Sequence, residues 1–333
     1  MTSLAHVSYT VDPAKLEALA GSDWGFVLSP LSDPLYLTLI VITLVVSVVG
    51  FVVGETFAPI RDYCRAIHDR LLEYRNHVPF FLRLALAVAL IISGTRQFIF
   101  LPNVPGAGIG NLEIFLGFSI LVGFMVRVSA LAVLGVYIYG LVTSHYLLGT
   151  MESAAAALVV AAYGAKTGPS IDGILGVDVL GKMCERMWNH ICENTGPIIR
   201  VALGFTLMWL AVTEKAMNPR VCEAVVIDFD LQNVIPVTAA MWVFTVGVIE
   251  LAVGLVLVLG FYTRTFSIIA FLVLTLSFFY FREEVAGHVT FFAALTVLMI
   301  TGAGRYSIDA WIARIRRNIQ GTAEPYAITA TAA

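Results

Sequence analysis

The sequence predicts an all-α polytopic membrane protein with about nine transmembrane helices, arranged as one extra helix followed by two parallel four-helix repeats. Its composition is 59% hydrophobic and 13% charged, whereas soluble domains carry about 25% charged residues. Apolar runs of about 20 residues, the length that crosses a bilayer as a helix, recur along the chain. Residues 110–172 and 247–309 also repeat each other without a gap.

The repeat retains a few polar and glycine positions at a constant separation of 137 residues. These positions lie within or beside apolar runs, so they are the first candidates for structural or chemical roles. The matched pairs are Gly110 with Gly247, Glu113 with Glu250, Arg127 with Arg264, and Asp172 with Asp309.

Nine spans are expected from the apolar runs. The first, at 35–54, belongs to neither repeat, and the arginine-rich stretch 55–79 after it is expected to form an amphipathic helix on the membrane surface. A second surface helix is expected in the linker that follows the first repeat, where Met183, Met187 and Trp188 have helical spacing. The remaining spans are expected at about 80–101, 109–126, 128–148, 151–165, 198–217, 240–261, 264–281 and 287–303.

These spans divide the chain into six segments. The loop at 218–239 is 15 residues longer than its counterpart at 102–108, and it is the main difference between the repeats. The segments are an extracytoplasmic N-terminal segment at 1–34, the extra helix with its arm at 35–79, a first four-helix unit at 80–172, a linker helix at 173–197, a second four-helix unit at 198–312, and a tail at 313–333.

The distribution of lysine and arginine predicts the orientation. Most of the 20 basic residues fall on one set of loops, which the positive-inside rule assigns to the cytoplasm. We therefore expect a multi-pass protein of the plasma (inner) membrane, with the N-terminus outside and the C-terminus in the cytoplasm. Both units then run in the same direction, related by an axis along the membrane normal.

No basic surface domain that would bind nucleic acid is present.

Three stretches of sequence resemble a known family. The segment Gly247–Arg264 reads GVIELAVGLVLVLGFYTR, the segment Gly302–Trp311 reads GAGRYSIDAW, and each unit opens on an arginine, Arg83 or Arg200. This resembles the DoxX/DoxD family of four-helix membrane proteins, whose members carry a Gly-x-x-Glu helix, a Gly-aromatic-x-x-Arg turn and a closing Gly-Pro-Gly-x-x-Ser-x-Asp segment. Ala303 stands at the usual proline, and the first unit departs from the pattern at its end.

The resemblance implies a link to membrane redox chemistry. The DoxD branch forms the large subunit of thiosulfate:quinone oxidoreductases, and other members accompany quinol oxidases or oxidative-stress complexes. A quinone is therefore the implied cofactor. Besides membrane lipids, the implied partners are subunits of a larger membrane complex and a small periplasmic subunit. The tandem form differs from the ordinary single-unit member, and the small subunit is not part of this chain.

The paired glutamates are the strongest candidate site residues. A charged residue within a span costs about 2.5–3.5 kcal/mol on insertion scales, so it usually faces the bundle interior and has a partner. The depths in the predicted helices pair Glu113 with Arg96, and Glu250 with Lys215 beside Glu214. One interpretation is an ion pair that fixes helix register. The other is a quinone or anion site near the outer leaflet, with Glu113, Glu250 and Arg96 as catalytic residues and Lys215 and Glu214 binding the ligand.

Other polar residues have simpler interpretations. Arg127 and Arg264 are expected to anchor cytoplasmic turns at the lipid headgroups. Asp172 and Asp309 are expected to cap the surface helices that follow them. Glu152 is expected on the outer surface, as part of an ordinary solvated rim or of a mouth for a substrate or partner.

Histidines and cysteines give no firm metal or haem site. His145 and His288 do not correspond in the repeat. A zinc site is conceivable from residues of the two cytoplasmic segments, but the spacing lacks a C-x-x-C pair, so no metal is assigned. Those residues are Cys64, His68, Cys184, His190 and Cys192. P-loop, Rossmann and c-type haem motifs are absent from the sequence.

Three functions remain open from the sequence. The first is an integral membrane subunit linked to quinone-dependent redox chemistry, passing electrons from a reduced sulfur compound to quinone. The second is a non-catalytic structural or assembly subunit of a larger respiratory or photosynthetic complex. A transporter is less favoured, because helices broken by Gly or Pro at mid-depth are not found in both halves.

Overall fold

The structure, a computed structural model, describes residues 11–320 apart from 12, 107, 282 and 284, and it is helical except for one short hairpin. The first unit consists of α5 (Val78–Thr95), α6 (Gly110–Val122), α7 (Val126–Thr143) and α8 (Met151–Tyr163). The second consists of α11 (Thr195–Leu210), α14 (Ala239–Leu259), α15 (Thr263–Phe281) and α16 (Val285–Thr301).

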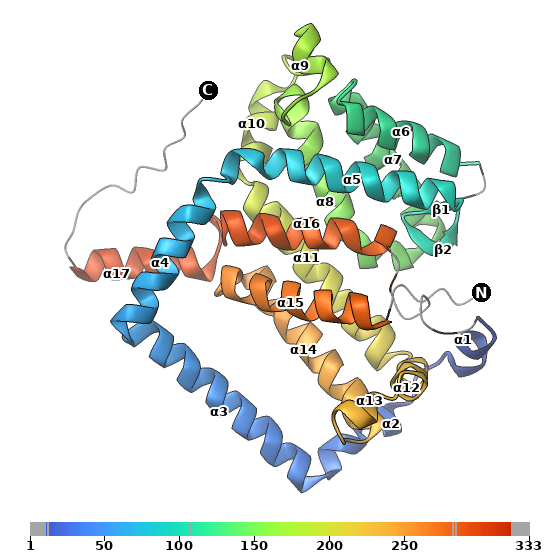
Figure 1. Cartoon of the computed structure of the whole chain (residues 1–333), viewed down its shortest axis with the longest axis vertical. Coiled ribbons are helices and arrows are strands. Elements are labelled where there is room, and N and C mark those ends of the chain that lie inside the picture. The colour runs from blue at the N-terminus through green and yellow to red at the C-terminus, as the bar shows by residue number, and fades with distance from the viewer. Residues whose placement is uncertain (1–10, 12, 107, 282, 284, 321–333) are drawn as a thin grey trace.

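Shorter elements join and flank these units. The hairpin of β1 (Phe98–Ile99) and β2 (Leu101–Pro105) follows α5. The chain begins with α1 (Pro13–Leu19), α2 (Trp24–Leu28), α3 (Pro34–Thr56) and α4 (Ala58–Leu72). The remaining helices are α9 (Ile171–Leu175), α10 (Glu185–Glu193), α12 (Pro219–Asp228), α13 (Leu231–Val234) and α17 (Ile308–Gln320). We call the two ends of the bundle the α10 end and the α12 end (Figure 1).

The first and fourth helices of both units form the centre of the bundle. The first helix of each unit packs on the fourth helix of the other: α5 lies on α16, and α11 lies on α8. The two fourth helices, α8 and α16, also meet. Such reciprocal contacts are those of a two-fold relation, in which the same surfaces of both partners face each other.

Glycine permits the close crossing of the first two helices in each unit. A Cβ on Gly204 would lie 2.6 Å from the backbone oxygen of Gly254, and a Cβ on Gly254 would lie 2.7 Å from that of Gly204. In the first unit, a Cβ on Gly117 would meet the backbone oxygen of Ala87 at 3.0 Å. Small residues at these positions let the backbones approach, as is common between helices in membranes.

The long apolar helices confirm the prediction of a multi-pass membrane protein. Within the described residues, six helices are long and apolar enough to cross a membrane, and a seventh candidate is the bent pair Trp24–Ser32 and Pro34–Ser47. Two further apolar helices, Gly110–Val122 and Gly287–Thr301, are shorter. Each of the nine expected spans coincides with a helix, but the span expected at 80–101 ends at Thr95, where the chain turns into the β1–β2 hairpin. The number that cross the bilayer, like the division into six segments, stays a prediction.

The N-terminal helices lie at the side of the bundle. α3 contacts α14 near its start, where the hydroxyls of Tyr36 and Thr245 lie 2.6 Å apart. Most of the α3 side chains whose positions are described are exposed. α4 then turns along the α10 end of the bundle and contacts α16, as the predicted surface arm requires (Figure 1).

Candidate functional site

A cluster of three charged side chains lies inside the second unit. Lys215 Nζ is 2.8 Å from Glu214 Oε2 and 3.0 Å from Glu250 Oε2. The Glu214 side chain is fully buried, while 25% of the Glu250 side chain is exposed. The predicted pairing of Lys215 with Glu250 is therefore present. Counted alone, the three groups carry one excess negative charge when both carboxylates are ionised.

The cluster depends on a change of helix type. At its α12 end α11 continues as a π-helical turn, Ala211–Ala216, in which Met217 N donates to Val212 O, five residues back, at 2.9 Å. A π-turn accommodates one more residue than an α-turn and often occurs at functional sites. Glu214 and Lys215 both lie in this turn.

Gly247 explains the spacing of the Gly-x-x-Glu pattern. A Cβ on Gly247 would lie 3.0 Å from the Cβ of Lys215. The bare backbone at Gly247 lets the stem of Lys215 lie against α14. Residues three apart share one face of a helix, so the ammonium then reaches Glu250.

The long loop of the second unit covers this cluster. α12 packs on α14 and on the π-helical turn, and the Cys222 thiol donates to the backbone oxygen of Glu214 at 3.5 Å. Burial raises the pKa of the Cys222 thiol to about 12, so the thiol stays protonated at neutral pH. The long loop at 218–239 that distinguishes the second unit contains α12 and α13.

The first unit does not reproduce the charged cluster. Ser93 Oγ donates to Glu113 Oε2 at 2.7 Å, and the Glu113 side chain is fully buried. Arg96 follows the last residue of α5 and is exposed. The expected pairing of Arg96 with Glu113 is thus replaced by a hydrogen bond from Ser93. Because the chain leaves helical geometry at Gln97, with φ of 57°, Arg96 does not continue along the helix face toward α6.

Gln97 occupies the position in the first unit that Lys215 has in the second. A Cβ on Gly110 would meet Gln97 Nε2 at 2.7 Å, just as one on Gly247 would meet Lys215. The initial arginines Arg83 and Arg200 are 117 residues apart, whereas Gln97 and Lys215 are 118 apart. The added residue is consistent with the π-turn. A neutral amide therefore stands in one unit where the other has an ammonium.

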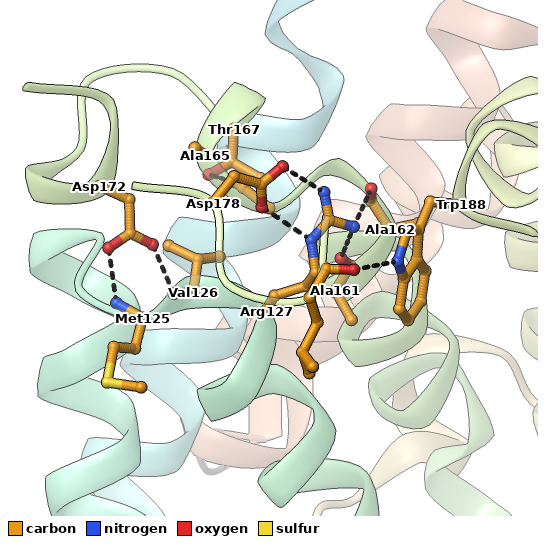
Figure 2. A network of polar contacts seen from close by, with 12 residues as sticks. Met125, Val126, Arg127, Ala161, Ala162, Ala165, Thr167, Asp172, Asp178 and Trp188 are labelled. Carbon is orange, nitrogen blue, oxygen red and sulfur yellow. Dashed lines mark hydrogen bonds and ion pairs between the residues drawn. The ribbon is translucent and has the colours of Figure 1, made fainter. Parts of the chain in front are cut away.

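The Ser-x-Asp segment that ends each unit is a capping device (Figure 2). Asp172 accepts bonds from the backbone N–H groups of Met125 and Val126, both at 2.8 Å, at the start of α7. Asp309 does the same for Tyr262 and Thr263 at 2.9 and 3.4 Å. We expected these aspartates to cap the surface helices that follow them. They instead cap the third helix of each unit, because the segment folds back over the turn between the second and third helices.

Arg127 and Arg264 also differ from expectation. Arg127 is buried and donates to the backbone oxygens of Ala161 and Ala162 at 2.8 Å, near the end of α8 (Figure 2). Arg264 donates to those of Met299 and Ile300 at 3.0 Å. The expectation of headgroup anchoring was wrong, because both arginines satisfy carbonyls that a helix end leaves unpaired. The shared motif therefore stabilises the turns and helix ends of both units.

Glu152 is a buried residue that sequence reasoning assigned to the surface. Only 1% of it is exposed. Thr206 Oγ1 donates to its Oε2 at 2.8 Å, and the hydroxyls of Ser153 and Thr290 each lie 3.3 Å from Oε1. A signal was available: Glu152 precedes a run of small residues, 153–157, of the kind that packs tightly between membrane helices.

Residues 197–283 match the DoxX family. This part of the second unit is a DoxX-like domain. The match spans α11 to α15 and so contains the charged cluster and its covering loop. No curated protein matches the chain, and no solved structure does.

The histidines and cysteines that the structure describes do not form a metal centre. Within the described part of the chain, no three His, Cys, Asp or Glu side chains are grouped to hold an ion. His68 lies 3.4 Å from Arg264 Nη1, and the Cys64 side chain falls outside the described residues. His145 is exposed, whereas His288 is buried and pairs with Glu283 at 2.5 Å.

Access to the charged cluster of the DoxX-like domain is from the side of the bundle. Glu250 lies about midway along α14, and its neighbours Ile249 and Leu251 are exposed. An open hollow is found elsewhere, at the α10 end, where α10 residues such as Met187 and His190 line it. Chemically, the cluster can accept or release a proton at Glu250 and hold an anionic group at Lys215.

Proposed function

We propose that this protein is an integral membrane subunit that serves quinone-linked redox chemistry, with Glu214, Lys215 and Glu250 as its proton and anion site. The single observation that carries the proposal is the Lys215–Glu250 ion pair inside an otherwise apolar helix bundle. Each charged residue within a span costs about 2.5–3.5 kcal/mol on insertion scales, so three together are a functional signal.

The exposed flank of Glu250 supports a ligand that arrives through the lipid. A quinone is an apolar molecule that partitions into membranes, and its reduction takes up protons while its oxidation releases them. Glu250 is partly exposed between two apolar residues of α14. A carboxylate there would exchange a proton with the quinone ring, and the Lys215 ammonium would hold the anionic form of that ring.

The covering loop supports a specialised second unit. Only the second unit has α12 over its cluster, and only the second unit places a lysine beside the Gly-x-x-Glu helix. With the α12 end outside the cell, as the lysine and arginine bias predicts, a periplasmic donor would approach this end. We propose a reduced sulfur compound as that donor, passed by a small periplasmic subunit, with the exposed Arg96 as a second anion contact in the first unit and Glu113 as a separate buried carboxyl group.

The test is a turnover assay on the full-length protein in membranes. Thiosulfate would be added as donor and a short-chain quinone as acceptor, and quinone reduction would be followed optically. Glu250→Gln is expected to lower turnover about 100-fold or more, in the range of one general acid–base group. The matched control is Glu223→Gln on α12, which loses only a surface ion pair with Arg220. Equal rates in the two variants would remove Glu250 from the proposal.

A second candidate function, a structural subunit of a larger membrane complex, is favoured by α3. This helix lies beside the bundle with most of its described side chains exposed (Figure 1). An apolar helix of this kind suits contact with another membrane subunit as well as with lipid. Purification in mild detergent tests it: recovery at fixed stoichiometry within a large assembly supports a scaffold, and recovery alone or with one small subunit opposes it.

A further inference from the structure

A carboxylate lies on the boundary between the two units, away from the charged cluster of the proposed function. Glu152 is in the first turn of α8, and its partners come from α8, α11 and α16. The hydroxyls of Ser153 and Thr290, which contact Oε1, lie 2.9 Å from each other. Within the described residues these side-chain partners are all hydroxyl groups, and no ion pair reaches Glu152.

The surroundings favour the neutral form of this carboxyl group. A charge taken out of water without a partner of opposite sign is strongly disfavoured, and a titratable group avoids this by binding a proton. Glu152 is 1% exposed and sits inside a bundle that crosses the membrane. Neutralisation by a proton is therefore the simplest way to hold it there.

The hydroxyl partners suit both protonation states. A hydroxyl both donates and accepts, and it can rotate to change roles. Thr206 Oγ1 accepts from the N–H of Met151 at 3.1 Å and donates to Glu152 Oε2. At Oε1, the Ser153 and Thr290 hydroxyls can donate to a carboxylate or accept from a carboxylic acid. A change of protonation state thus requires hydroxyl rotation and leaves the heavy atoms in place.

We propose that Glu152 is a proton-binding site at the boundary between the two units, that it holds a proton at neutral pH, and that loss of this proton weakens the packing of the units. The proposal goes beyond the quinone-linked function and does not depend on it. A sodium ion is the competing ligand, because carboxylate and hydroxyl oxygens also bind hard cations.

Titratable groups on the elements packed against α8 fall into two sets. Toward the α12 end, near Glu152, are Tyr137 of α7, His145 and Tyr146 of the segment before α8, and His288 of α16 with its partner Glu283. Toward the α10 end, at the other end of α8, are Arg83, Arg127, Lys166, Arg200, and the α10 residues Glu185, Arg186, His190, Cys192 and Glu193. His288 is therefore the group whose titration must be separated from that of Glu152.

Infrared spectroscopy of the full-length protein in lipid nanodiscs tests the protonation state directly. The carbonyl stretch of a carboxylic acid is distinct from the bands of a carboxylate. At neutral pH, wild type is expected to show one more carboxylic-acid carbonyl per chain than Glu152→Gln, whose amide still fits the three hydroxyls. Glu223→Gln should leave this band unchanged. No difference between wild type and Glu152→Gln at neutral pH would overturn the proposal.

Thermal unfolding gives a second measurement. Raising the pH from 7 to 10 is expected to lower the Tm of wild type more than that of Glu152→Gln, and His288→Gln should retain the wild-type response. Parallel curves for wild type and Glu152→Gln would contradict the proposal, as would stabilisation by sodium that Glu152→Gln abolishes. If Glu152→Gln does not fold, the double variant Glu113→Gln/Glu250→Gln assigns the band, because it removes the other carboxyl groups that could hold a proton. A carboxylic-acid band that remains in this variant and disappears at alkaline pH supports the proposal, and its absence at neutral pH would overturn it.

Discussion

The hydroxyls of Ser153 and Thr290 meet at 2.9 Å, and the two residues are 137 positions apart in the chain. That separation is the spacing of the sequence repeat, so equivalent residues of the two halves touch each other. Such a contact lies on the axis of a two-fold relation, which also accounts for the reciprocal packing of α5 on α16 and α11 on α8. The two halves therefore build one bundle with a shared core.

Lys215 is expected to matter more for stability than either carboxylate it contacts. Removing one partner of a buried ion pair leaves an uncompensated charge and costs about 3–5 kcal/mol. Lys215→Gln leaves Glu214 and Glu250 close together without their shared ammonium. Glu250→Gln leaves a balanced Glu214–Lys215 pair and should cost about 1 kcal/mol, the size of one hydrogen bond. Unfolding of both variants in detergent measures the difference, and equal losses would contradict the shared-cation account.

Gly260 is expected not to tolerate alanine. Its φ is +69°, and a Cβ there would overlap the guanidinium of Arg200 and approach the Cβ of Ser307 at 2.5 Å. A residue held at positive φ costs about 1–3 kcal/mol from strain alone, so Gly260→Ala should lower the Tm by several degrees. Gly135 is the matched control, because a Cβ on it meets nothing within 4 Å. It lies inside α7, where alanine should stabilise by about 0.5–1 kcal/mol.

The two capping aspartates are expected to differ in strength. Asp172→Ala and Asp309→Ala should each cost about 0.5–2 kcal/mol, the usual range for a lost N-cap. Asp172 should lie higher in that range, because both of its bonds are 2.8 Å, whereas one bond of Asp309 is 3.4 Å. Chemical denaturation of the two variants gives the comparison. A larger loss of unfolding free energy for Asp309→Ala than for Asp172→Ala would show that hydrogen-bond length does not determine which cap is stronger.

Cys192 is expected to react slowly with maleimides over a wide pH range. Burial raises the pKa of this thiol to about 11, and the thiolate is the reactive form. For a thiol with that pKa, about one molecule in a thousand is a thiolate at pH 8, and the fraction rises tenfold per pH unit. Peptide mapping by mass spectrometry should thus find labelling of Cys192 still rising between pH 8 and 10. A labelling rate that levels off by pH 10, in place of rising about tenfold per pH unit, would mean that the thiol titrates near the ordinary pKa of about 8.5.

The fold was largely predictable because long apolar helices need only hydrophobic length and periodicity. The Lys215–Glu250 contact was predictable because depth along two neighbouring helices follows from residue counts. The prediction of an Arg96–Glu113 contact was wrong, because counting residues along a span assumes that the helix continues, and α5 ends before Arg96. The π-turn at Ala211–Ala216 and the α12 fold depend on tertiary packing, which no local pattern reports.

Glu152 illustrates a different limit. A glutamate at the start of a predicted span is interpreted as a surface residue, because the ends of membrane helices are usually exposed to water. Its burial depends on α11 and α16, which begin 43 and more residues later and belong to the other unit. The two-fold packing that creates its surroundings follows from the repeat only when the contacting faces of both units are known.

The most direct measurement is equilibrium binding of a short-chain quinone to the full-length protein in nanodiscs. Wild type, Glu250→Gln and the surface control Glu223→Gln would be compared at neutral pH. We expect the control to bind as wild type does and Glu250→Gln to bind about tenfold more weakly, a change of about 1.4 kcal/mol. Equal affinity in all three proteins, or no binding to wild type, would contradict the assignment of the Glu214–Lys215–Glu250 cluster as a quinone site.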